Sequence, residues 1–115
     1  MPEHEGQRPG GGGGGPTFVP ISNTPPVSAG TSTQGGIQYN MYATQVSSTD
    51  GTAHSIGVSV PSGCLVNPSS PLPIQASPDN PTQLTVYVPT TNTGRVDATC
   101  SQTGYTDYVI TMQGG

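Results

Sequence analysis

The stretch from Gly36 to Pro61 constrains the fold most, because apolar and polar residues alternate through much of it. Alternation with a period of two is typical of a β-strand that buries one face. It occurs on both sides of Asp50-Gly51, a pair that favours a tight hairpin turn because glycine accepts positive φ without a clash. The pattern therefore predicts a β-hairpin with one apolar face. The expected inward residues are Ile37, Tyr39, Met41 and Ala43 on the first strand and Ile56, Val58 and Val60 on the second.

Further short strands follow, separated by turns rich in Pro, Gly, Asn and Ser. Residues 83–88 and 95–101 alternate most clearly, 105–112 form a last strand, and 64–66 and 72–76 suit short segments. No window has the 3.6-residue period of a helix. About seven short strands with frequent turns predict an all-β protein, a single small antiparallel β-sandwich of the immunoglobulin-like or jelly-roll type. The expected inward residues of the two clearest strands are Leu84, Val86, Val88, Val96, Ala98 and Cys100.

The composition changes near Gly36 and predicts two parts. Residues 1–36 contain a Gly10–Gly15 run, several prolines and many Ser and Thr, so they bury too little apolar surface to fold alone. We expect an extended Gly/Pro-rich arm over 1–36 and a β-sandwich over 37–113 that folds without it. Within the arm, the apolar residues Phe18, Val19 and Ile21 are the expected anchors on a binding partner.

The charge balance excludes two classes of partner. The chain has no Lys, two Arg and a net charge of −4, and only 7% of its residues are charged. Nucleic-acid binding requires cations that neutralise phosphates, and attraction to anionic membranes requires them too. No apolar run is long enough for a transmembrane helix, and no signal peptide is visible. The polar, weakly charged surface favours a virion surface or another extracellular assembly.

Cys64 and Cys100 are the two cysteines. A disulfide between them would close a loop of about 36 residues and stabilise the fold by roughly 3–4 kcal/mol. The alternative is a pair of buried reduced thiols, as in proteins that fold in the cytosol. The sequence leaves both open.

No residue pattern predicts catalysis, a cofactor or a metal. His54 lies near Asp50 and several serines, but the strained turn that exposes a serine nucleophile is not indicated. Two cysteines without companion ligands do not make a zinc site, and Glu3-His4-Glu5 is interpreted as a solvated charge cluster. Tyr42 and Tyr87 are expected to point outward, as a subunit contact or, less readily, as a platform for carbohydrate.

In strand number, turn spacing and polar composition, residues 36–113 resemble the small immunoglobulin-like β-sandwich proteins of tailed-phage virions. The resemblance implies a non-enzymatic structural protein that decorates or cements a capsid, contacts other virion proteins and forms homo-oligomers. Attachment through the N-terminal arm would follow. Two alternatives stay open: a carbohydrate- or receptor-binding module of a virion fibre, and a surface or pilus-type subunit that exchanges strands with its neighbours.

Overall fold

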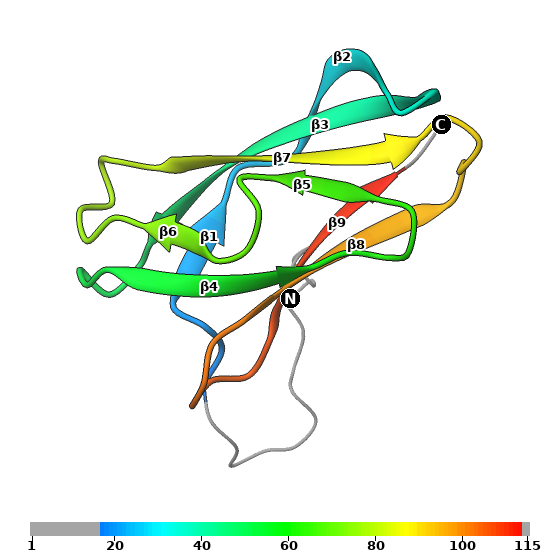
Figure 1. Cartoon of the computed structure of the whole chain (residues 1–115). Helices are drawn as coiled ribbons and strands as arrows, with labels where there is room; N and C mark the ends of the chain where they lie inside the picture. The colour runs from blue at the N-terminus through cyan, green and yellow to red at the C-terminus, as the bar shows by residue number, and fades with distance from the viewer. Residues whose placement is uncertain (1–16, 114–115) are drawn as a thin grey trace.

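The computed structural model describes residues 17–113, in which every regular element is a β-strand. Two antiparallel sheets pack face to face (Figure 1), which confirms the predicted small all-β sandwich. The first sheet contains β1 (Ile21–Asn23), β2 (Val27–Gln34), β3 (Ile37–Ser48), β5 (Leu65–Asn67) and β7 (Thr82–Pro89). The second contains β4 (His54–Ser59), β6 (Leu72–Ile74), β8 (Arg95–Ser101) and β9 (Tyr108–Gln113).

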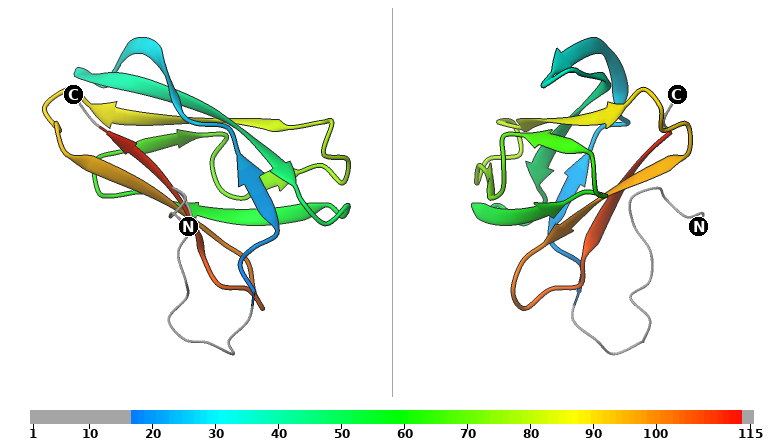
Figure 2. Two further views of the ribbon diagram at one scale, coloured as in Figure 1. Left: turned by 180° about the vertical axis from the view of Figure 1, so that it is seen from behind. Right: turned by 45° about the vertical axis from the view of Figure 1, so that its right-hand side comes forward.

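The neighbour order in both sheets is that of the immunoglobulin sandwich. The path β1-β3-β7-β5 corresponds to strands A, B, E and D of that fold, and β4-β8-β9 corresponds to C, F and G. Two strands are additional: β2 pairs with β3, and β6 pairs with β4 at the edge of the second sheet. Figure 2 shows the two layers from behind and in a view turned by 45° from that of Figure 1.

The core lies between the two sheets and is built largely as the alternation predicts. On β7 and β8 every second residue is fully buried, and on β4 Ile56 is buried as expected. Val58 and Val60 pack against the same cluster. The predicted inward residues of these three strands are therefore confirmed.

The predicted hairpin around Asp50-Gly51 is wrong. The strands on its two sides belong to different sheets, β3 pairing with β7 and β4 pairing with β8 and β6. The intervening residues form an arch that crosses from one layer to the other (Figure 1). Both ends of the arch, Ser48 and His54, are buried polar residues. A tight turn supplies the reversal of the chain, but which strands pair is decided by the apolar faces that the two layers must cover.

The inward face of β3 is also the opposite of the predicted one. Thr44, Val46 and Ser48 are buried toward the core, and Tyr42 packs against it. Tyr39 is buried as predicted, at 5% exposure, but it lies outside the core cluster on the outer face, where its ring meets that of Tyr87 edge-on with centroids 6.2 Å apart. Because successive side chains of a strand point to opposite faces, one wrong assignment inverts the whole strand. Both faces of β3 carry apolar residues, so alternation alone did not distinguish them.

The arm predicted over 1–36 is wrong for its second half. β1 and β2 both pair with β3, and Gly35 and Gly36, with φ of 58° and 83°, form the two-residue turn between β2 and β3. Two main-chain hydrogen bonds join Thr17 and Val19 to Thr106, at 2.8 and 3.0 Å. The sequence did not predict β2 because its residues are mostly small and polar and show no alternation of apolar and polar side chains. Their backbone groups nevertheless pair with β3 as in any strand. Residues 1–16, with the Gly10–Gly15 run, lie outside the described residues.

Val19 and Ile21, expected as anchors on a partner, are core residues of the sandwich itself. Their exposed fractions are 1% and 3%. Phe18 is half-buried and forms an isolated bridge to Thr106. Burial of apolar side chains stabilises the fold in proportion to their area. Val19 and Ile21 therefore stabilise the sandwich itself and are not available to a partner.

Candidate functional site

The most elaborate polar cluster holds the arch between the sheets together. The Nε2 atom of His54, at the start of β4, lies 2.9 Å from Oδ1 of Asp50, and its Nδ1 lies 2.9 Å from Oε1 of Gln102. The same Asp50 oxygen accepts hydrogen bonds from the hydroxyls of Ser48 and Thr52, at 3.0 and 2.9 Å. Tyr105 meets the imidazole edge-on. The cluster joins the arch to the turn after β8.

This cluster lacks the geometry of a serine hydrolase. In a Ser-His-Asp triad the serine hydroxyl and the aspartate bind opposite nitrogens of the histidine. Here the nitrogen opposite Asp50 faces Gln102, and the Ser48 hydroxyl donates to Asp50 rather than to His54. The hydrogen bond with His54 is the main cause that lowers the pKa of Asp50 well below its usual range. These interactions link Asp50 in the arch to His54 on β4 and to Gln102 after β8, and so stabilise the arch.

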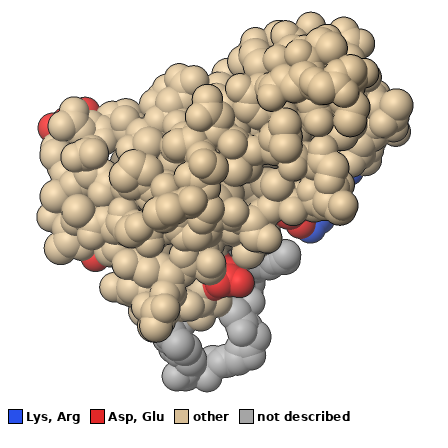
Figure 3. Space-filling view, in the orientation of Figure 1, with Lys and Arg blue, Asp and Glu red and all other residues tan. Residues whose placement is uncertain are grey.

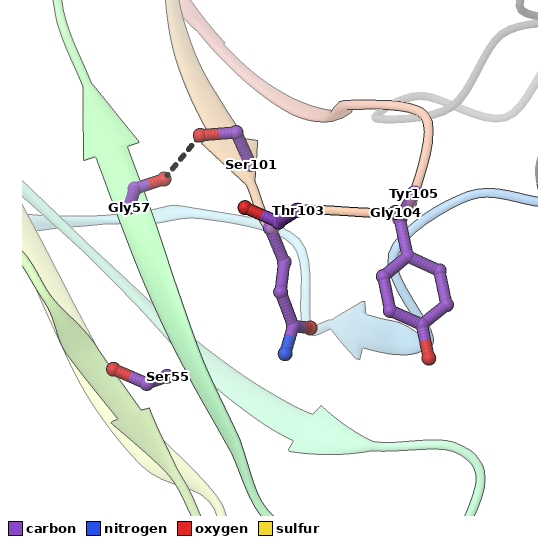
Figure 4. A pocket seen from close by; sticks show the side chains of 7 residues that line it. Ser55, Gly57, Ser101, Thr103, Gly104 and Tyr105 are labelled. Atoms are coloured by element: carbon purple, nitrogen blue, oxygen red, sulfur yellow. Dashed lines mark hydrogen bonds between the residues drawn. The ribbon is translucent and has the colours of Figure 1, made fainter.

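An open groove of about 680 Å³ lies beside this cluster, at the point where the pairing of β8 with β4 ends. Figure 4 shows Ser55 and Gly57 on the β4 side, Ser101 at the end of β8, and Tyr105 in the turn beyond it. Ser101 donates a 3.4 Å hydrogen bond to the carbonyl of Gly57. A Cβ on Gly57 would come within 3.2 Å of that serine hydroxyl, which would have to shift by a few tenths of an ångström to accommodate it. The lining is hydroxyl, amide and one aromatic ring.

The two cysteines are free buried thiols, so the structure has the second of the two predicted arrangements. Cys64 precedes β5 in the first sheet, and Cys100 lies on β8 in the second. Burial, and then the charge of Asp107, raise the pKa of Cys100 to about 12. Burial raises the pKa of Cys64 as well.

The predicted tyrosine pair is not brought together. Tyr42 and Tyr87 lie on adjacent strands, but Tyr42 packs against the core and Tyr87 lies on the outer face of the first sheet. Tyr87 instead has Met41 directly across from it on β3 and Leu65 directly across on β5. The three side chains form a row across three strands on one face.

This row is part of a larger apolar surface, which we call the outer apolar face. It is formed by residues on the side of the first sheet that faces away from the core: Val27, Ile37, Met41, Leu65 and Tyr87. Tyr39 lies on the same side but is only 5% exposed. All three large apolar side chains that are exposed within residues 17–113 belong to the outer apolar face: Val27 at 59%, Ile37 at 50% and Leu65 at 39%. Sequence reasoning missed this surface because it placed Val27 in the arm and the odd-numbered residues of β3 in the core.

The outer apolar face is also free of charge. The charged residues between 17 and 113 are Asp50, Asp79, Arg95, Asp97 and Asp107, and none of them lies on a strand of the first sheet. The space-filling view shows an unbroken uncharged surface over the part of the molecule where β2 lies (Figure 3). On the second sheet, by contrast, Arg95 forms a two-point ion pair with Asp97.

Within residues 17–113 no group of three His, Cys, Asp or Glu side chains is placed to hold a metal ion. That part of the chain also contains no helix long and apolar enough to cross a membrane. The Glu3-His4-Glu5 cluster lies outside the described residues. No protein-family model matches the chain, and no curated protein or solved structure shows significant similarity to it.

Proposed function

We propose that the chain is a non-enzymatic structural subunit of an extracellular, virion-type assembly, joined to its neighbours through the outer apolar face. The observation that carries this proposal is the concentration of Val27, Ile37 and Leu65 on one uncharged sheet surface. Contiguous exposed apolar surface marks a site of protein contact in a soluble protein. The arm contributes less than the sequence suggests, because two of its three apolar anchors are used in the core.

The composition supports an assembled rather than an enzymatic role. A surface with few charges and many Ser, Thr, Asn and Gln can be buried against neighbours without leaving unpaired ions. Asp50 and His54 form the polar cluster that most resembles a catalytic site. The His54 nitrogen opposite Asp50 faces the amide oxygen of Gln102, where a hydrolase would have its nucleophile. This cluster therefore gives no support to a serine-hydrolase activity, whereas the outer apolar face supports a role in assembly.

The test is fractionation of particles from the organism that encodes the chain. The protein is followed with an antibody through a density gradient, and we expect it to sediment with the particles. A variant with Val27→Ser, Ile37→Ser and Leu65→Ser should stay at the top, because each change removes apolar area from the contact. The matched control is Val109→Ser, a half-buried position on β9 in the second sheet. Wild-type protein that stays at the top of the gradient would contradict the proposal.

A second function, binding of neutral carbohydrate, is favoured by the groove beside Tyr105. Sugars are bound by hydroxyl and amide groups together with an aromatic ring, and the groove supplies Ser55, Ser101, Thr103, Gln102 and Tyr105. Its test is titration with a panel of neutral oligosaccharides, followed by NMR. Chemical-shift changes confined to the groove, and lost in Tyr105→Ala, would support it. No change in any groove signal would exclude it for those sugars.

A further inference from the structure

We infer that the neighbour bound by the outer apolar face is a second copy of this chain, packed face to face in a two-fold dimer. This inference rests on the proposed function and identifies the partner of its surface. In such a dimer the first sheets of two copies pack as the two layers of a sandwich do, with aligned strands about 30° apart. The same patch serves both copies, as in any two-fold contact.

Charge is the first argument for a second copy. The chain carries a net charge of −4, so bringing two copies together costs repulsion unless the contact surfaces are neutral. The strands of the first sheet carry none of the five charged residues between 17 and 113, whereas Arg95 and Asp97 lie on β8 of the second sheet. A charged partner would have to bury its ions here without a counter-ion, whereas a second copy brings an identical uncharged face.

Area is the second argument. The strand β7 is eight residues long, about 26 Å at about 3.3 Å per residue. The three strands β2, β3 and β7 span about 14 Å at about 4.8 Å spacing, and the three-residue β5 adds a strip about 10 Å long, so the face covers about 420 Å². Two such faces bury about 840 Å² in all, which is the size of a weak, transient complex. We therefore expect a dimer that dissociates on dilution.

The composition of residues 1–16 argues against the chain covering this face with its own N-terminus. That segment contains no Val, Ile, Leu, Phe, Tyr or Trp. Its apolar side chains are Met1 and three prolines, which cannot fill a surface built around Leu65, Tyr87 and Met41. The face needs a partner with its own apolar side chains, and the second copy supplies them.

The first experiment is sedimentation velocity of the full chain over a wide range of concentrations. We expect a monomer–dimer equilibrium in the wild type. Truncation of Val27, Ile37 and Leu65 together to Ser should raise the dimer dissociation constant by at least about tenfold, because three contact side chains are lost. Val109→Ser on the second sheet should leave the constant unchanged. A wild type that stays monomeric at the highest concentration would overturn the inference.

A charge-swap experiment identifies the partner as a second copy. One variant carries Val27→Asp and Leu65→Asp, and another carries Val27→Arg and Leu65→Arg. Each alone should be monomeric, because a face-to-face dimer places like charges together. Mixed in equal amounts they should form a one-to-one heterodimer, since every contact between the faces is then of opposite sign, whichever way round the copies pack. A mixture that stays monomeric would contradict the two-fold contact.

These outcomes are distinct from failure of the proposed function. If the wild-type protein sediments with particles but is monomeric when purified, the inferred dimer is wrong. The proposed assembly role then stands, with a different protein as the partner of the outer apolar face. A wild type that dimerises when purified but stays at the top of the particle gradient would refute the assembly role alone. Thermal melting of every variant confirms that each one is folded before its result is used.

Discussion

The hydroxyl of Tyr108 on β9 donates a 2.6 Å hydrogen bond to Oδ1 of Asn23 on β1, and so joins the two sheets across the sandwich. The two residues are 85 positions apart in the chain. The ring of Tyr108 is buried, at 6% exposure, while its hydroxyl satisfies an acceptor near the sandwich edge. An aromatic side chain with a polar tip suits such a place, because its body fills the core and its hydroxyl finds a partner.

Removal of this hydroxyl should destabilise the fold measurably. In Tyr108→Phe the ring stays and the donor is lost, leaving the half-buried Asn23 oxygen without that hydrogen bond. The expected loss is about 1–2 kcal/mol in the free energy of unfolding. Urea denaturation of the wild type and the variant measures it. The exposed Thr103→Ala is the control and should change stability by less than about 0.5 kcal/mol. Equal stability of Tyr108→Phe and wild type would show that water replaces the bond at no cost.

Truncation of the N-terminal segment should distinguish its two halves. Deletion of residues 1–16 should leave the melting temperature nearly unchanged, because this Gly- and Pro-rich sequence offers little apolar surface to the core. Deletion of residues 1–23 should unfold the domain, since it removes Val19, Ile21 and the whole of β1. Circular dichroism during heating measures both. A cooperative transition in the longer deletion would mean that the core tolerates the loss of two of its members.

Single core changes in this segment should be costly. Ile21→Ala removes a side chain that is 3% exposed and should cost about 2–4 kcal/mol. The control is Ser22→Ala, the exposed neighbour of Ile21 on β1, which should cost less than about 0.5 kcal/mol. If the two variants melted together, Ile21 would be acting as a surface anchor, as the sequence alone suggested.

The Asp50–His54 pair should make stability depend on pH in a defined direction. The pKa of Asp50 is lowered in the folded state, so its contribution is complete above its unfolded pKa of about 4 and is lost as the pH falls toward the folded value. Asp50→Asn should therefore be less stable than wild type at pH 7, with a difference that shrinks at pH 3. Asp79→Asn, in the loop before β7, is the control. A constant difference between the two pH values would contradict the assigned role.

The thiols should react slowly in the native protein. The pKa of Cys100 is raised to about 12 by burial and Asp107, and that of Cys64 is raised by burial, so little thiolate exists at pH 8. A chromogenic disulfide reagent should label neither thiol rapidly until guanidinium unfolds the chain, and then two per molecule. If no thiol were labelled after unfolding, the two cysteines would form a disulfide.

The alternation pattern was sufficient to assign the buried face of strands that have one clearly apolar face. The alternation on β7 and β8 placed their core residues correctly, and the lack of helical periods gave the all-β class. The same reasoning placed Ile56 and the short segments before β7. These features depend on side chains one or two residues apart, which a sequence displays directly.

The tertiary structure alone decided which strands pair and which face is outward. Asp50-Gly51 turns the chain in a hairpin or in an arch equally well, and only the pairing of β3 with β7 and β4 with β8 selects the arch. β3 has apolar residues on both faces, so its inward side depends on the distant strands that cover it. The segment with β1 and β2 looked unstructured because its backbone pairing and the burial of Ile21 need β3 beside them. The outer apolar face, the arch and the Tyr108–Asn23 bond all join residues far apart in the chain, and contacts of that kind leave no periodic signal in the sequence.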